Sequence, residues 1–385
     1  MRHAKPSLAG QARTNRDLLR NMGKVAGRFR EWRPQEEVLL DVEAVPTCFP
    51  AYDVANGIGG HPVSRIVLVH GPSNEGKTAF ELGLLASFLA RGHFAGLGDA
   101  ERTTPAKWVT TMLGGLAKSP GFVALPIRTY EQVRDAVRSM CEGVAEARVK
   151  REIPETTSAI IAIDSIRKLV PKKLFDELAK AEKADGEEKK AKGRFAKKPK
   201  GVDGYGGRAA QLKAALNAAW MDELVPLLAD TRTSMLLIAR ETKLDDANPW
   251  GEAKRDWKIG GGTALYYEAS LAVRVTREFI HVEKRLVGER HDLEIHKTKV
   301  AGKQEEAPTA FFHVSNGAIA PEGFDRARDV VALAIRTGAL IIRGSWIADG
   351  RPVWRWRRAR RARSRSYAPT RSCWSGSSRS RARRE

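Results

Sequence analysis

Short, mostly apolar runs alternate along the chain with longer stretches in which apolar residues recur at helical spacing. The runs occupy residues 66–69, 94–97, 122–125, 159–163, 235–238 and 271–275. Such runs are typical of strands covered on both faces, as in a parallel sheet with helices on either side. An apolar helix is expected over residues 78–91, ended by Gly92. The pattern predicts an α/β fold built on a mostly parallel sheet flanked by helices.

An amphipathic helix is expected ahead of these strands, over residues 14–32. Its apolar positions recur at spacings of three and four: Leu18, Met22, Val25, Phe29 and Trp32. The apolar stripe packs either on its own domain or on a neighbouring subunit, and the sequence leaves both open. We treat residues 1–38 as an N-terminal helix and a candidate oligomerisation element.

The net charge of +21 is unevenly distributed along the chain. Residues 351–385 contain thirteen arginines and one acid, Glu385, with no periodicity, which indicates a disordered Arg/Ser-rich tail. The rest of the chain is still basic, which favours a nucleic-acid partner over charge that is merely solvated. A second basic stretch has seven positive charges and no acid: Lys189, Lys190, Lys192, Arg194, Lys197, Lys198 and Lys200. This stretch is expected to be a mobile loop or a solvated helix.

Several classes of protein are excluded by what the sequence lacks. It has no apolar run of about eighteen residues that could span a membrane. The first thirty residues are polar and basic, without a signal-peptide core. Its three cysteines lack ligand spacing, which argues against a disulfide framework and a zinc site. We expect a cytoplasmic protein with no membrane partner.

The segment after the first expected strand carries the most specific chemistry. Gly71-Pro72-Ser73-Asn74-Glu75-Gly76-Lys77-Thr78, followed by Ala79, fits the P-loop pattern G-x-x-x-x-G-K-[ST]. Backbone N–H groups of such a loop surround phosphate oxygens at the positive end of the following helix. Lys77 is expected to reach the β- and γ-phosphates of ATP, and the Thr78 hydroxyl to bind Mg²⁺.

Two acids at the ends of later strands complete an expected ATPase site. Asp164 ends the run at 159–163 as a Walker B aspartate does, although an acid there could also only cap a helix. Glu101 follows the run at 94–97, where its carboxylate could polarise the attacking water. We expect Asp164 to help hold the metal and Glu101, with Lys77, to act in hydrolysis.

Ordered motifs give the chain a resemblance to the RecA family of DNA recombinases. They are Val45-Pro46-Thr47, residues 57–62 before the P-loop, Asp99-Ala100-Glu101, Asp164-Ser165-Ile166, residues 260–267 and Lys297-Thr298-Lys299. Gly338, Gly344-Ser345-Trp346 and Gly350 look like the start of the small C-terminal domain of that family. The resemblance covers residues 40 to 350. It implies a RecA-like ATPase core over residues 39–320 and the start of the small domain over 321–350.

The resemblance also implies a function and further site residues. A RecA-like ATPase forms a helical filament of identical subunits on single-stranded DNA and exchanges strands with double-stranded DNA. Lys297 and Lys299 resemble the K-x-K pair that reaches the γ-phosphate held by the neighbouring subunit. Trp108 is assigned to stack on adenine, an assignment that needs a one-residue gap.

By the same resemblance, two segments are assigned to DNA binding. The first is residues 172–210, which contains the basic stretch 189–200, and the second is residues 242–260. In the second, Lys254 and Arg255 add charge, and Trp250 either stacks on bases or has a structural role.

The chain departs from the family at two places. Ala239-Arg240-Glu241 stands where the family has a polar amide that senses the γ-phosphate. Arg240 either contacts that phosphate or pairs with an acid such as Glu241. The tail after residue 350 resembles no family, and is either a frameshifted end of the reading frame or a genuine DNA-binding tail.

Three functions remain in competition. An ATP-dependent recombinase accounts for all of the ordered motifs. A ring-forming motor such as a helicase would share the P-loop and the metal-binding acid but lack the later motifs. A nucleic-acid-coating protein with weak ATPase activity would hydrolyse ATP with little response to DNA.

Overall fold

The structure of the protein is a computed structural model that describes residues 42–172, 205–243, 257–260, 263–301, 308–343 and 346–349. The chain divides into two compact units, Met1–Val42 and Glu43–Glu385, and the description below concerns the second. The expected helix at 14–32 and the tail at 351–385 lie outside the described residues. So do the seven basic residues of 189–200, together with Trp250, Lys254 and Arg255.

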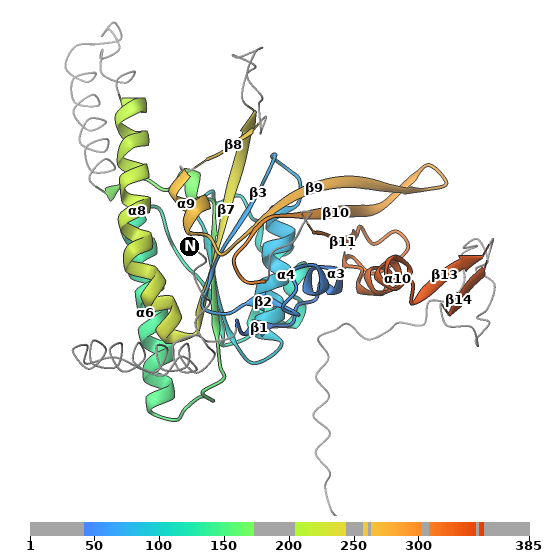
Figure 1. The fold of residues 1–385 in the computed structure, drawn as a ribbon, viewed down its shortest axis with the longest axis horizontal. Helices are drawn as coiled ribbons and strands as arrows, with labels where there is room; N and C mark the ends of the chain where they lie inside the picture. The colour runs from blue at the N-terminus through green and yellow to red at the C-terminus, as the bar shows by residue number, and fades with distance from the viewer. Residues whose placement is uncertain are drawn as a thin grey trace, which may run out of the picture. The chain divides into compact units, whose positions relative to one another are not determined.

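A large sheet forms the centre of the second unit (Figure 1). Among the described residues its strands lie in the order β12-β11-β10-β9-β3-β7-β6-β4-β5. Six of these come from the apolar runs: β3 (Ile66–Gly71), β4 (Phe94–Asp99), β5 (Phe122–Ala124), β6 (Ala159–Asp164), β7 (Thr233–Lys243) and β9 (Leu271–Val282). Each pairs in parallel with its neighbours in this set, which confirms the mostly parallel sheet.

The sheet continues beyond β9 as an antiparallel extension. It consists of β10 (Arg285–Thr298), β11 (Thr309–Ser315) and β12 (Gly323–Phe324). The long β9–β10 hairpin turns at Glu283 and Lys284, both of which have positive φ angles. A further strand, β8 (Trp257–Ile259), pairs antiparallel with the last residues of β7.

Helices cover both faces of the sheet (Figure 1). On one face lie α6 (Tyr130–Val149), α8 (Tyr205–Thr231) and α9 (Thr263–Glu268), which share an apolar core with alternate residues of the strands. On the other face lies α4 (Lys77–Leu89), the helix expected from residues 78–91, which contacts α5 (Ala106–Leu113). Since α8 begins at Tyr205, the last residues of the expected first DNA segment are helical.

Local sequence signals explain where these helices begin and end. Thr129 caps α6 by accepting a hydrogen bond from the Gln132 N–H at 3.2 Å, and the Gln132 side chain accepts one from the Thr129 N–H in return. This reciprocal arrangement satisfies N–H groups that a helix start otherwise leaves unpaired. Gly92, just beyond α4, has a φ of +76°, as expected for a residue that ends a helix.

Smaller elements surround this framework. They are β1 (Ala44–Val45), α3 (Pro50–Ala55), β2 (His61–Pro62), the short 3₁₀ helices η1 (Gly114–Lys118) and η2 (Ile166–Lys168), α10 (Arg326–Arg336), β13 (Leu340–Arg343) and β14 (Trp346–Asp349). An aromatic cluster packs the start of α3 against α4 and β11, with the Phe49 ring 5.1 Å from Phe80 and 4.7 Å from Phe312. Among the described residues, no helix has the length and apolarity needed to cross a membrane.

Candidate nucleotide-binding site

The P-loop connects β3 to α4, as its sequence context predicts. Its backbone requires glycine at two places. A Cβ atom on Gly71 would lie 2.4 Å from the Val275 carbonyl oxygen, and one on Gly76 would lie 2.2 Å from the His291 ring. Gly76 is also the N-cap of α4, so no side chain at that position covers the first N–H groups of the helix. These N–H groups are suited to bind an anion.

Thr78 and Asp164 meet at the carboxyl end of the parallel sheet. The Thr78 Oγ1 donates a hydrogen bond to Asp164 Oδ2 at 2.8 Å. Burial raises the pKa of Asp164 to about 6, and the carboxylates of Glu101 and Asp99 add to this effect. A hydroxyl and a carboxylate side by side are oxygen ligands of the kind that Mg²⁺ prefers, so the pair fits a magnesium site.

Lys77 lies within the loop that it follows. Its Nζ donates to the Gly71 carbonyl at 3.1 Å and to the Pro72 carbonyl. Burial lowers the pKa of Lys77, while the carboxylates of Asp164, Glu241 and Glu75 oppose that shift. The side chain is thus held in the loop, among groups that favour its charged form.

Glu101 follows β4 and faces the same region. Its Oε1 accepts a hydrogen bond from the Ser165 hydroxyl at 2.7 Å. Asp99, the last residue of β4, fixes the turn that contains Glu101 by accepting hydrogen bonds from the N–H groups of Arg102 at 2.6 Å and Thr104 at 2.9 Å. Glu101 is therefore held near Asp164, as the sequence predicted.

A cavity of about 550 Å³ joins these groups. It is lined by Ser73–Ala79, Glu101, Trp108, Asp164 and Arg240 among the residues expected from sequence. The structure therefore brings these residues together, with Gly71 and Pro72 at the entry to the loop. The cavity is also lined by Arg277, Glu289 and His291, which the sequence did not single out.

The chain is similar in sequence to RecA proteins over most of its length. The RecA N-terminal domain family matches residues 19–185. "Protein RecA" of Thermus thermophilus is 26% identical over 336 residues, which cover 87% of this chain and 84% of that protein. "Protein RecA" of Geobacter sulfurreducens is 24% identical over 316 residues, 82% of this chain and 78% of that protein. The chain is therefore similar to RecA proteins, and these matches support a RecA-type family for it.

The β9–β10 hairpin holds the P-loop from the side. The His291 Nδ1–H donates to the Glu75 carbonyl at 3.0 Å, and the ring stacks on Phe312 with centroids 4.6 Å apart. The Arg277 N–H donates to Glu75 Oε2 at 2.6 Å. Glu75 is thus fixed through both its backbone and its side chain. These contacts depend on antiparallel pairing far along the chain, and no motif marks them.

Lys297 and Lys299 do not line the cavity of their own subunit. Lys297 lies at the end of β10 and Lys299 just after it, and both donate to carbonyls in the last turn of α9. Lys297 bonds Tyr266 at 2.5 Å and Tyr267 at 2.6 Å, and Lys299 bonds Tyr267 at 2.8 Å. Burial, with the neighbouring charge of Lys299, lowers the pKa of Lys297 to about 8.

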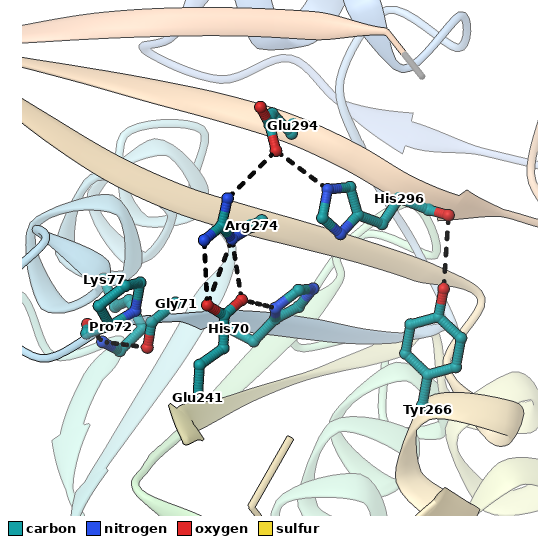
Figure 2. Close-up of polar contacts among 9 residues, drawn as sticks. All are labelled: His70, Gly71, Pro72, Lys77, Glu241, Tyr266, Arg274, Glu294 and His296. Carbon is teal, nitrogen blue, oxygen red and sulfur yellow. Dashed lines mark hydrogen bonds and ion pairs between the residues drawn. The ribbon is translucent and has the colours of Figure 1, made fainter. Parts of the chain in front are cut away.

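The structure separates the two residues that depart from the RecA family pattern. Arg240 is exposed and lines the nucleotide cavity. Glu241 is buried, and accepts hydrogen bonds from His70 at 2.7 Å and from Arg274 at 3.0 Å (Figure 2). Both Glu241 oxygens accept from these residues, and no hydrogen bond or ion pair joins Glu241 to Arg240 among the contacts of the described residues. This leaves Arg240 directed to the cavity.

Proposed function

We propose that this protein is a RecA-type, ATP-dependent DNA recombinase that forms filaments on single-stranded DNA and promotes homologous pairing and strand exchange. The observation that supports it best is the convergence of Lys77, Thr78, Asp164 and Glu101 on one cavity, in a chain that also has Lys297 and Lys299 in family order. A P-loop supports ATP binding, and the later residues connect that site to assembly and DNA.

Within one subunit, each group has a distinct role in ATP hydrolysis. The N–H groups of Ser73 to Ala79 and the Lys77 ammonium bind the phosphates. The Thr78 hydroxyl and the Asp164 carboxylate hold Mg²⁺, which neutralises charge on the phosphate oxygens when bound. Glu101, fixed by Ser165, accepts a proton from the attacking water. Arg240 contacts the γ-phosphate, and the Trp108 ring stacks on adenine.

Between subunits, Lys297 and Lys299 bind the γ-phosphate held by the neighbour. In the single subunit these ammonium groups satisfy carbonyls of Tyr266 and Tyr267, and do not line the subunit's own cavity. A phosphate across the interface is a stronger partner for an ammonium group than a neutral carbonyl. Nucleotide-dependent assembly follows from this exchange of partners.

DNA binding is assigned to basic and aromatic residues of the segments 172–210 and 242–260 that lie outside the described residues. Lys189, Lys190, Lys192, Arg194, Lys197, Lys198 and Lys200 contact the phosphate backbone of single-stranded and double-stranded DNA, with Lys254 and Arg255. Trp250 stacks on bases. Binding through backbone charge explains why no base-reading motif is needed.

Electron microscopy tests the proposal most directly. The protein is imaged with long single-stranded DNA, with and without a slowly hydrolysed ATP analogue. Continuous filaments that require the nucleotide, and are lost in a Lys297→Ala/Lys299→Ala variant, are the expected result. Rings would instead indicate a motor, and irregular coating that ignores the nucleotide would indicate a nucleic-acid-coating protein.

A further inference from the structure

A polar network crosses four neighbouring strands beside the nucleotide cavity (Figure 2). Its centre is the buried carboxylate of Glu241 on β7. His70 of β3 donates to it at 2.7 Å, and Arg274 of β9 donates through Nε at 3.0 Å and 3.2 Å and through Nη2 at 3.2 Å. Arg274 also lies 3.6 Å from Glu294 of β10. The carboxylate is therefore held from two directions by strands that carry the P-loop and the hairpin.

The charge state of this centre is set by its partners. Burial opposes ionisation of Glu241, but the hydrogen bonds from His70 and Arg274 outweigh it and lower the pKa of Glu241. Burial lowers the pKa of His70 despite the adjacent carboxylate, which favours a neutral ring whose Nδ1–H donates to it. Arg274 supplies the compensating positive charge.

Glu241 stands where β7 leaves the main sheet. The pairing of β7 with β6 ends at Leu237, and its pairing with β3 ends at Arg240, opposite Gly71. From Glu241 onward β7 pairs with β8 instead. The backbone ladder with β3 therefore stops just before Glu241, after that with β6 has already ended, and the side-chain network fixes the direction in which the strand continues.

The neighbouring residue points to the opposite face. Successive residues of a strand alternate between faces, so a buried Glu241 on the α9 face places Arg240 on the cavity side. The Arg240 side chain makes no hydrogen bond or ion pair among the contacts found in the described part of the chain, and it lines the cavity beside the P-loop. The orientation of Arg240 thus depends on what holds the residue after it.

We propose that Glu241, held by His70 and Arg274, is a positioning residue that aims Arg240 at the γ-phosphate of ATP. This inference rests on the proposed ATPase function. In the RecA family a polar amide at this place senses the γ-phosphate, and here Arg240, held by the Glu241 network, takes that role. The P-loop backbone has support of its own, because β3 pairs with both β7 and β9 as far as the loop.

Nucleotide affinity is the first test. Glu241→Gln keeps the shape of the side chain and removes its charge. We expect the affinity for a non-hydrolysable ATP analogue to fall about tenfold, since misplacing a group by about 1 Å can cost a hundredfold. The affinity for ADP, which has no γ-phosphate, should stay within about twofold. Glu223→Gln on α8, which removes an exposed ion pair with Arg138 of α6, is the matched control and should change neither.

A double-mutant cycle with Arg240→Ala is the second test. If Glu241 acts through Arg240, Glu241→Gln lowers kcat/KM for ATP about tenfold in the natural protein and by less than about twofold in the Arg240→Ala background. Thermal unfolding of each variant checks folding. If Glu241→Gln does not fold, Glu241→Asp, which keeps the charge but shortens the side chain, enters the same cycle.

The results separate this inference from the proposed function. The positioning role would be overturned if Glu241→Gln weakened ADP and ATP-analogue binding equally. It would also be overturned if the kcat/KM losses of Glu241→Gln and Arg240→Ala multiplied in the double variant. Neither result would contradict the proposed ATPase function. A protein that binds neither nucleotide, with Lys77→Ala indistinguishable from the natural chain, would overturn both. The affinity comparison does not require hydrolysis, so it decides the matter even if turnover is slow.

Discussion

His291 is a buried side chain that contacts the P-loop from a strand far away in the sequence. Its ring fills the space left by Gly76 and donates to the Glu75 carbonyl at 3.0 Å. In His291→Ala, we expect the loss of this hydrogen bond and of the ring packing to destabilise the protein by about 2 kcal/mol. We also expect KM for ATP to rise about fivefold through looser loop geometry. Calorimetry and steady-state kinetics measure the two effects.

A matched variant isolates the hydrogen bond of His291 from its volume. Asn keeps a donor near the position of Nδ1, so His291→Asn should recover part of the KM change. If Ala and Asn raise KM equally, the hydrogen bond to Glu75 does not position the loop.

Lys297 should titrate in an accessible range of pH. Burial and the charge of Lys299 lower its pKa to about 8, against about 10.4 for an ordinary lysine. The uncharged, reactive amine therefore increases as the pH rises through about 8, well before it does so in ordinary lysines. Acylation followed by mass spectrometry between pH 7 and pH 9 should label Lys297 ahead of Lys107, an exposed lysine of α5. Labelling of Lys297 only near pH 10 would show that its ammonium is not disfavoured.

The sequence predicted those residues of the candidate cavity that belong to local motifs. Lys77, Thr78 and Asp164 could be predicted because a P-loop and a strand ending in an acid are patterns of neighbouring residues. His291 and Arg277 could not, because their role depends on the register of β9 and β10. Glu241 could be noticed only as a departure, since its partners lie 171 and 33 residues away.

Among the elements, α10 illustrates how one buried pair attaches a helix. His313 of β11 lies 2.6 Å from Asp329 of α10, and Asp329 is 1% exposed. Asp329→Ala leaves His313 without this partner, so we expect the docking of α10 to weaken by about 3 kcal/mol. Hydrogen exchange should rise across Arg326–Arg336, while P-loop amides stay protected. Asp325→Ala, which removes only the N-cap of the same helix, should cost about 1 kcal/mol. Equal exchange in both variants would exclude a special role for the buried pair.

The strands show which elements the sequence could predict. Parallel strands buried on both faces, such as β3 and β6, appear as uninterrupted apolar runs. The run expected at 271–275 extends in the structure to Val282. Beyond Val275 no residue of β9 is buried, and polar residues interrupt the apolar run. β10 was missed for the same reason, since it is charged on one face and apolar on the other. Antiparallel strands of this kind lack the signal on which the parallel ones were found.

For the molecule as a whole, the decisive property is where the positive charge lies. Residues 351–385 supply +12 of the net +21, yet the groups around the nucleotide cavity all come from residues 73 to 314. The residues that line the cavity and the arginines of the tail therefore lie in separate parts of the sequence. Removing the tail thus tests its contribution to DNA binding without removing any residue that lines the cavity.

Deletion of residues 351–385 separates the two readings of the tail. ATP turnover without DNA should stay within about twofold, since no residue lining the cavity is removed. If the arginines contact DNA, single-stranded DNA affinity falls and the dependence of log K on log salt flattens by about 0.7 for each lost phosphate contact. Fluorescence anisotropy across a salt series measures both. An unchanged slope together with full strand exchange would show that the tail contributes nothing to DNA binding, as a frameshifted end of the reading frame requires. A flatter slope with lost strand exchange would instead establish the tail as part of the DNA-binding surface.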